Sequence, residues 1–295
     1  MIEHLNKGAC APERVVIIGA GGFVGGTIAK ALVAAGIPTL PLTRRQVDLL
    51  APDAAGTLRD RLRPTDSLVV VSAIAPAKTS AMLMDNLRMA QAVCEAVAAV
   101  TPVHLVYVSS DAIYADDANP VTEQSPAAPS TLHGMMHAAR ELMLRCASAA
   151  PFVALRPTLI YGADDPHSGY GPNRFRRQAA KGEPIGIFGE GEERRDHVLV
   201  DDVAALAVLM LQHRSVGGLN AVTGRSISFH DIAHLVAAQF SPAASVVSVP
   251  RPGPRPHLLH RHFDITNCLK AFPGFRYTSP AEGIARVHRE IVGRR

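Results

Sequence analysis

The stretch that most constrains the fold of this chain is residues 15–25, which read VVIIGAGGFVG. A run of β-branched residues breaks into glycines and resumes as the Ala-rich, periodic segment 27–35, a pattern typical of a strand, a tight turn and a helix. Glycines in such a turn let backbone N–H groups approach a pyrophosphate, and the helix N-terminus adds partial positive charge. Gly19, Gly22 and Gly25 stand three apart, unlike the Gly-x-Gly-x-x-Gly of the commonest dinucleotide turn. The motif alone favours a dinucleotide site, but it also fits a glycine-rich turn without a ligand.

Composition limits the other classes of protein. The chain has 295 residues, of which 47% are hydrophobic and 19% charged, as expected for one large or two unequal globular domains. Because no apolar run approaches ~18 residues and residues 1–12 lack an apolar core, we expect a cytoplasmic protein without a membrane segment. The net charge of +4 is dispersed, which suits an anionic small molecule and predicts no nucleic-acid partner.

The end of the expected second strand, residues 37–42, bears on the choice of cofactor. In a nucleotide-binding sheet this end lies beside the adenosine ribose, where a carboxylate selects NAD. Here Thr43, Arg44 and Arg45 follow the strand, and an arginine can neutralise a 2′-phosphate. The pattern favours NADP, with NAD possible, although two solvated arginines in a loop would look the same. Asp48 is placed to reach the adenine amino group.

Expected strands alternate with expected helices along the first half of the chain. A helix at 54–62 precedes a strand at 68–71, and a helix at 82–97 precedes a strand at 103–108. Residues 1–12 read as a loose leader. Such alternation predicts right-handed βαβ units and a doubly wound parallel sheet, with ligands at the carboxyl ends of the strands. Ser72 and Ala73 at one such end are small enough to let a cofactor lie against the backbone, and Ser110 stands at the next.

Four further segments resemble the extended short-chain dehydrogenase/reductase family, the NAD-dependent epimerase/dehydratase group that modifies nucleotide sugars. They are residues 109–114, 155–162, 188–191 and 195–203. With the glycine turn, they follow the order of the family over nearly the whole chain. The resemblance implies a Rossmann domain (12–160 plus 197–222), a smaller substrate-binding lobe (161–196 plus 223–295), and hydride transfer at a sugar carbon by a ketoreductase, epimerase or dehydratase.

The chain departs from this family at the catalytic Tyr-x-x-x-Lys pair. Histidine occupies both aligned positions, as His133 and His137, and no Tyr-x-x-x-Lys occurs elsewhere. Residues four apart share one face of a helix, so both imidazoles are expected to face the cofactor cleft. An imidazole with a pKa near ~6.5 exchanges protons at neutral pH. We therefore expect His133 to act as the general acid/base, Ser110 to hydrogen-bond the reacting oxygen, and His137 to bond the ribose hydroxyls.

Three other interpretations of the histidine pair stay open. In the first interpretation, the chain is a catalytically inactive NAD(P)-binding sensor or a partner-binding subunit. A metal site is disfavoured because the pair lacks an evident third ligand and the Glu of His-Glu-x-x-His. The proton could also move through a neighbouring acid or phenol, for which the candidates are Asp111, Tyr114, Tyr161 and Tyr170.

The resemblance also implies contacts with cofactor and substrate. The expected cofactor-binding residues are Gly19, Gly22, Phe23, Val24, Gly25, Arg44, Asp48, Leu49, Ser72, Ala73, His137, Pro157 and Leu159. The expected contacts with a nucleotide-sugar-like substrate are Asn173, Arg174, Arg195 and Arg255, the last slightly ahead of Arg251. A solvated helix face around Asn173 and a polyproline linker around Arg255 are the alternatives. By the same resemblance we expect a homodimer formed through helices at 82–97 and 130–147.

Overall fold

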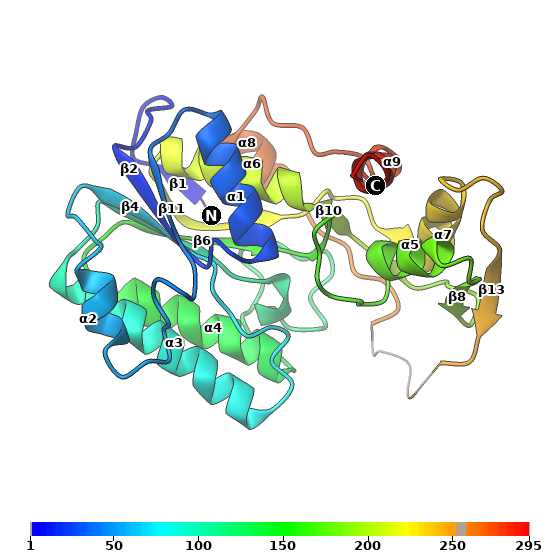
Figure 1. Ribbon diagram of the computed structural model, residues 1–295, viewed down its shortest axis with the longest axis horizontal. Coiled ribbons are helices and arrows are strands. Elements are labelled where there is room, and N and C mark those ends of the chain that lie inside the picture. The colour runs from blue at the N-terminus through cyan, green and yellow to red at the C-terminus, as the bar shows by residue number, and fades with distance from the viewer. Residues whose placement is uncertain (1, 252, 254–257, 295) are drawn as a thin grey trace.

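The computed structural model describes residues 2–251, 253 and 258–294 as an α/β fold built on one large sheet (Figure 1). Within these residues the sheet has seven strands. In spatial order they are β1 (Ile2–His4), β11 (Ser215–Ala221), β6 (Phe152–Pro157), β5 (His104–Val108), β4 (Asp66–Val70), β2 (Arg14–Ile18) and β3 (Thr39–Leu42). Neighbouring strands pair in parallel except β1 and β11, which are antiparallel. The predicted doubly wound Rossmann-type sheet is confirmed.

Helices cover both faces of this sheet, and each face has its own apolar core. One face carries α1 (Phe23–Ala34), α6 (Val200–Gln212) and α8 (Thr266–Ala271), and the other carries α2 (Ala54–Arg59), α3 (Ser80–Ala99) and α4 (Leu132–Cys146) (Figure 1). Because side chains alternate along a strand, Val15 and Ile17 of β2 join the first core while Val16 and Ile18 join the second. This burial on both sides explains why residues 15–18 of the strand are all apolar.

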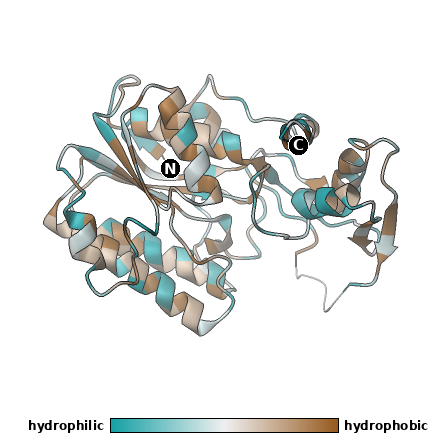
Figure 2. Ribbon diagram, in the orientation of Figure 1, coloured by the Kyte–Doolittle hydropathy of each residue, from teal (hydrophilic) through white to brown (hydrophobic). Residues whose placement is uncertain are grey.

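A smaller lobe lies beyond the carboxyl ends of the strands. It contains α5 (Pro172–Ala180), α7 (Phe229–Ala237), α9 (Pro280–Val292), and the parallel pair β8 (Ile185–Phe188) and β13 (Val246–Val249). Phe175, Ile232 and Ile284 pack in its core. Figure 2 shows that hydrophilic residues cover much of α5, the helix that carries several of the expected substrate contacts. Short pairs join the lobe to the sheet: β7 (Leu159–Tyr161) with β10 (His197–Leu199), and β9 (Arg194–Arg195) with β12 (Ile227–Ser228).

One expectation about local structure is wrong. Residues 2–4 are not a loose leader but the edge strand β1, because β11 offers them a free row of backbone groups. Asp201 and Asp202 lie in the first turn of α6, yet neither side chain caps this helix. Asp202 instead accepts hydrogen bonds from the backbone N–H and hydroxyl of Thr278, at 2.8 and 2.9 Å, and so fixes the approach to α9.

The helices differ modestly from the expected boundaries. Helix α2 ends at Arg59 rather than near residue 62, and α3 starts at Ser80 because the side chain of Thr79 caps it. Across the part of the chain that the structure describes, no helix is both long and apolar enough to cross a membrane.

Candidate active site

One large cavity follows the carboxyl ends of the parallel strands. Its volume is about 1150 Å³, and its walls come from the turn after β2, the ends of β4, β5 and β6, the start of α4 and the loop before α5. Every expected cofactor-binding residue lines it, as do Ser110, Asp111, His133 and Asn173. Residues expected to act together are therefore gathered around one space, while their individual roles stay predictions.

The glycine turn fits a bound dinucleotide. Gly19 has a φ of +98°, and a Cβ there would lie 2.6 Å from the backbone nitrogen of Ser72. A Cβ on Gly25 would lie 2.2 Å from the carbonyl oxygen of Gly19. Gly22 begins α1 without a side-chain cap, and no acidic residue stands in the first turn. Unpaired N–H groups and the positive end of the helix dipole therefore meet the cavity, as a pyrophosphate requires.

At the expected adenosine end, Arg44 and Asp48 form an ion pair. Arg44 Nε lies 3.1 Å from Asp48 Oδ2, and the Arg44 side chain is 79% exposed. The backbone N–H of Leu50 and the Arg44 guanidinium lower the pKa of Asp48, so this carboxylate stays charged. Thr43, Arg44 and Arg45 all line the cavity, so two cations are available where a 2′-phosphate would lie.

Ser110 stands at the point where β5 turns into the 3₁₀-helix η1 (Asp111–Ile113). Its hydroxyl caps this short helix by accepting a hydrogen bond from the Ala112 N–H at 3.1 Å. Gly134 in the first turn of α4 lies so close to η1 that a Cβ there would be 2.0 Å from the carbonyl oxygen of Ala112. This close approach brings His133 to the cavity wall that Ser110 occupies.

The two histidines of α4 lie against each other, and both are held neutral. Their rings meet edge to face with centroids 4.7 Å apart. Burial lowers the pKa of His133, and the nearby His167 lowers it as well. The pKa of His137 is lowered further, mainly by burial and also by His133 and Arg140. His133 Nδ1 is buried without a hydrogen-bond partner among the described residues, whereas His137 Nδ1 lies 2.8 Å from the Tyr107 hydroxyl.

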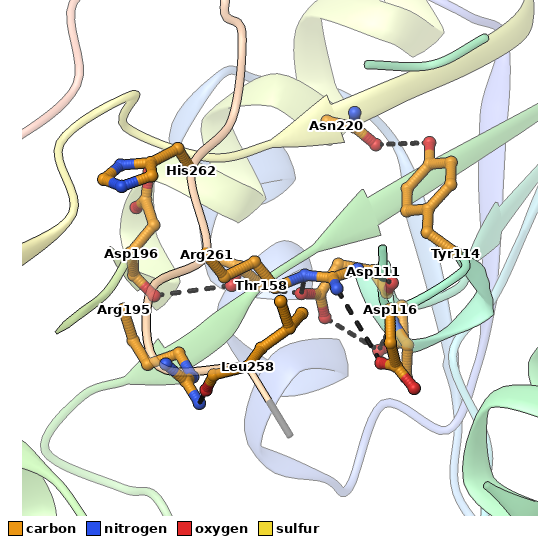
Figure 3. Close-up of polar contacts among 12 residues, drawn as sticks. Asp111, Tyr114, Asp116, Thr158, Arg195, Asp196, Asn220, Leu258, Arg261 and His262 are labelled. Atoms are coloured by element: carbon orange, nitrogen blue, oxygen red, sulfur yellow. Dashed lines mark hydrogen bonds and ion pairs between the residues drawn. The ribbon is translucent and has the colours of Figure 1, made fainter. Parts of the chain in front are cut away.

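Asp111 is held by residues from two distant segments (Figure 3). Arg261 Nε lies 3.7 Å from its carboxylate, and Thr158 donates a hydrogen bond to it at 3.4 Å. Burial raises the pKa of Asp111 despite the opposing effect of Arg261. Sequence reasoning missed Arg261, because the residues around it form no motif that distinguishes it from a surface arginine.

Two of the four proposed alternative proton carriers lie away from the cavity. Tyr161 points toward α9. The Tyr114 hydroxyl is 2.7 Å from Asn220 Oδ1 (Figure 3) and 2.9 Å from Arg156 Nη1. Asp111 and Tyr170 do line the cavity. The Tyr170 hydroxyl accepts a hydrogen bond of 2.8 Å from the backbone N–H of Phe188, which leaves its own proton able to be donated.

The expected substrate contacts separate into two groups. Asn173 lines the cavity and donates a hydrogen bond to the buried Asp165. Arg174 and Arg195 do not line it. Arg195 donates to the carbonyl oxygens of Leu258 and Leu259, at 2.9 and 3.0 Å, as Figure 3 shows for Leu258. The expected contact at Arg255 lies outside the described residues.

An aromatic and arginine cluster, formed by Tyr170, Phe188, Arg174 and Arg251, reaches the cavity through Tyr170. Tyr170 and Phe188 stack with ring centroids 4.3 Å apart. The guanidinium carbons of Arg174 and Arg251 lie 5.7 and 5.3 Å from the Phe188 centroid. Arg251 also forms an ion pair with Glu193, which neutralises part of the positive charge.

His197 is a second residue that sequence reasoning missed, and it lines the cavity. It is 2% exposed, and neither ring nitrogen forms a hydrogen bond of ordinary geometry within the described residues. Its ring packs edge to face on Phe229, and burial lowers its pKa to about 4. The segment 195–203 contained this residue, but its pattern did not show that the ring would turn toward the cavity.

A protein-family model described as the NAD dependent epimerase/dehydratase family matches residues 15–222. The chain belongs to this family. The resemblance that the motifs predict is thereby confirmed, whereas the match says nothing about the histidine pair. The glycine turn, Ser110 and the start of α4 all fall inside the matched residues.

Individual relatives of the family agree with the fold. One relative is the ADP-L-glycero-D-manno-heptose-6-epimerase of Alkalilimnicola ehrlichii, to which the chain is 30% identical over 148 residues. The match covers 46% of each chain and so spans less than half of that relative. The UDP-N-acetylglucosamine 4-epimerase from Bacillus cereus superposes with a TM-score of 0.83 at 20% identity, covering 95% of this chain and 96% of that one. A GDP-L-fucose synthetase from Naegleria fowleri bound to NADP also gives 0.83, at 16% identity and 98% and 95% coverage.

Among residues 2–251, 253 and 258–294, no three His, Cys, Asp or Glu side chains lie together as metal ligands. The site instead offers two neutral imidazoles, a serine hydroxyl and a carboxyl of raised pKa around one space. These groups suit proton exchange and hydrogen bonding to a neutral oxygen.

Proposed function

We propose that the protein is an NAD(P)-dependent oxidoreductase, epimerase or dehydratase that acts on a nucleotide-activated sugar, with His133 in place of the usual tyrosine. The observation that carries this proposal is the single cavity, which joins a dinucleotide-type glycine turn to Ser110, His133 and His137. A bound nicotinamide would take up or return a hydride at the sugar carbon. The protein must then bind the sugar and move the hydroxyl proton.

His133 is suited to accept that proton when the sugar is oxidised. Its lowered pKa keeps the imidazole unprotonated at neutral pH, and the ring lines the cavity. The Ser110 hydroxyl accepts a hydrogen bond from the Ala112 N–H and donates one of 3.4 Å to Asp111 Oδ1, so its proton must turn from this carboxylate to reach the reacting oxygen. In the reverse direction, a protonated His133 would be a stronger acid than a tyrosine but would be present in a smaller fraction of molecules.

The nucleotide-sugar substrate is supported by the similar proteins, each of which is an enzyme of a nucleotide-linked sugar. It is also supported by the cluster of Tyr170, Phe188, Arg174 and Arg251, because aromatic faces suit a base and guanidinium groups suit phosphate oxygens. Arg195 would reach a phosphate only after giving up the Leu258 and Leu259 carbonyls.

Two finer proposals accompany this function. We propose NADP as the preferred cofactor, because Arg44 and Arg45 line the expected adenosine end and Asp48 there is already paired. We also propose a homodimer through α3 and α4, which pack side by side on one outer face (Figure 1).

The deciding experiment compares turnover and cofactor affinity in His133→Ala. UDP-, GDP- and dTDP-sugars are offered with NADP or NAD, and products are analysed by chromatography and NMR. We expect turnover to fall by about 10²–10⁴-fold, with the Kd for the cofactor nearly unchanged. His234→Gln, on the exposed face of α7, is the matched control and should keep full turnover.

Two results would count against the proposal in different ways. Unchanged turnover in His133→Ala would remove the proton-transfer role from this residue and direct attention to Asp111. Tight cofactor binding by the native protein, without turnover of any sugar in the panel, would instead favour the catalytically inactive sensor.

A further inference from the structure

The side chain behind the histidine pair is a buried tyrosine. Tyr107 belongs to β5 and is 1% exposed, and its hydroxyl lies 2.8 Å from His137 Nδ1. His137 is 6% exposed and lines the cavity. One nitrogen of this imidazole is therefore committed to the protein interior, and only Nε2 is left to meet a ligand.

Because both groups are neutral, this hydrogen bond has two possible directions, one for each tautomer of His137. Burial raises the pKa of Tyr107 to about 12, so the phenol keeps its proton. The pKa of His137 is far below its ordinary value, so the ring is neutral and carries one N–H. If the phenol donates to Nδ1, that ring proton must sit on Nε2.

Arg140 fixes the tyrosine from the other side. It is fully buried, and its guanidinium carbon lies 5.3 Å from the Tyr107 ring centroid. It donates hydrogen bonds to the Ser72 carbonyl at 2.7 Å and to Asn86 Oδ1 at 3.2 Å. The arginine therefore ties the cavity wall at Ser72 to the ring on which His137 depends.

We propose that Tyr107 locks His137 as a neutral imidazole with its proton on Nε2, aimed into the cavity as a fixed donor for a hydroxyl oxygen of the ligand. Arg140 is a positioning residue for Tyr107 and touches no ligand. The ligand chemistry is a sugar hydroxyl, such as one of the diol of a nicotinamide ribose, and this part rests on the proposed function. The site would thus hold a ribose by a neutral, oriented donor rather than by a cation.

The tautomer is tested by ¹⁵N NMR of protein carrying ¹⁵N-histidine, without nucleotide. The His137→Gln variant identifies the His137 signals by their loss. In the native protein we expect the ¹⁵N pattern of a ring protonated at Nε2 only. In Tyr107→Phe we expect that preference to be lost and the Kd for the dinucleotide to rise about tenfold, the equivalent of about 1.4 kcal/mol.

Tyr114→Phe is the matched control. It also removes a buried phenol hydroxyl, but that hydroxyl bonds Asn220 and Arg156 instead of the histidines. The His137 pattern should be unchanged in this variant. A native His137 that is doubly protonated or protonated at Nδ1 would overturn the proposal, as would an unchanged pattern in Tyr107→Phe. Because the spectra need no ligand, failure of the protein to turn over a sugar would leave this test intact.

Discussion

Gly134 lies directly against the carbonyl oxygen of Ala112, so that a Cβ at position 134 would be 2.0 Å from that oxygen and 2.7 Å from the Cβ of Pro129. Neither neighbour is the end of a flexible side chain. The first turn of α4 can therefore reach η1 only with glycine at this position. Since His133 is the preceding residue, the placement of the proposed acid/base depends on this contact.

Replacing Gly134 by alanine should damage both stability and turnover. We expect the free energy of unfolding to fall by about 1–3 kcal/mol, because overpacking forces α4 away from η1. Turnover should fall further than cofactor affinity, since the glycine turn is on a different wall. Chemical denaturation and steady-state kinetics measure the two effects. The control is Gly56→Ala in α2, where no atom lies within 4 Å of the new Cβ and helix propensity should leave stability unchanged or raised.

Replacing Arg44 by aspartate should reverse the preference for NADP. The change removes a positive charge beside the expected 2′-phosphate and puts in its place a carboxylate, which repels the phosphate. We expect the ratio of NADP to NAD affinity to fall at least tenfold, measured by titration calorimetry with both cofactors. Arg88→Asp is a suitable control, because Arg88 forms a comparable exposed ion pair with Asp85 on α3. An unchanged ratio in Arg44→Asp would show that the 2′-phosphate is not bound there.

Replacing Leu142 by arginine should dissociate the proposed homodimer. Leu142 and Met135 are 59% and 47% exposed and stand seven residues apart on one face of α4, and Met84 of α3 is 49% exposed. A charge in the centre of a buried interface is costly, so light scattering should show a shift toward monomer. Val33→Arg, on α1 and 68% exposed, adds the same charge on the opposite face and should leave the mass unchanged.

Local patterns were enough to predict the sheet and the cleft. A continuous apolar run ending in glycine has few foldable outcomes, and helices between strands fix the parallel order. The residues after each strand must then meet at one edge of the sheet. For this reason the sequence alone allows Gly19, Ser72 and Ser110 to be placed around one cavity.

Contacts between distant segments could not be predicted in this way. Arg261 approaches Asp111 across 150 positions of the chain, and nothing in either local sequence records that meeting. The strand β1 is only three residues long, too short to show alternation. Arg195 is in an expected motif, yet its guanidinium is satisfied by carbonyls of a loop more than sixty residues away.

The buried His104 predicts a loss of stability in mild acid. Burial lowers its pKa to about 4, and it makes a 2.7 Å hydrogen bond from Nε2 to the Ser215 carbonyl. The unfolded chain binds a proton at this residue below its ordinary pKa of ~6.5, whereas the folded chain does so only near 4. Its contribution to stability is therefore complete above pH 6.5 and is lost as the pH falls toward 4.

Between pH 7 and pH 5 this residue alone should lower the free energy of unfolding by about 2 kcal/mol. His104→Gln keeps a donor for the Ser215 carbonyl but cannot titrate, so urea denaturation at the two pH values should show a loss smaller by that amount. The exposed His234→Gln should lose as much as the native protein. An equal loss in His104→Gln and the native protein would mean that the acid sensitivity comes from other buried groups, with His197 the next to replace because burial also lowers its pKa to about 4.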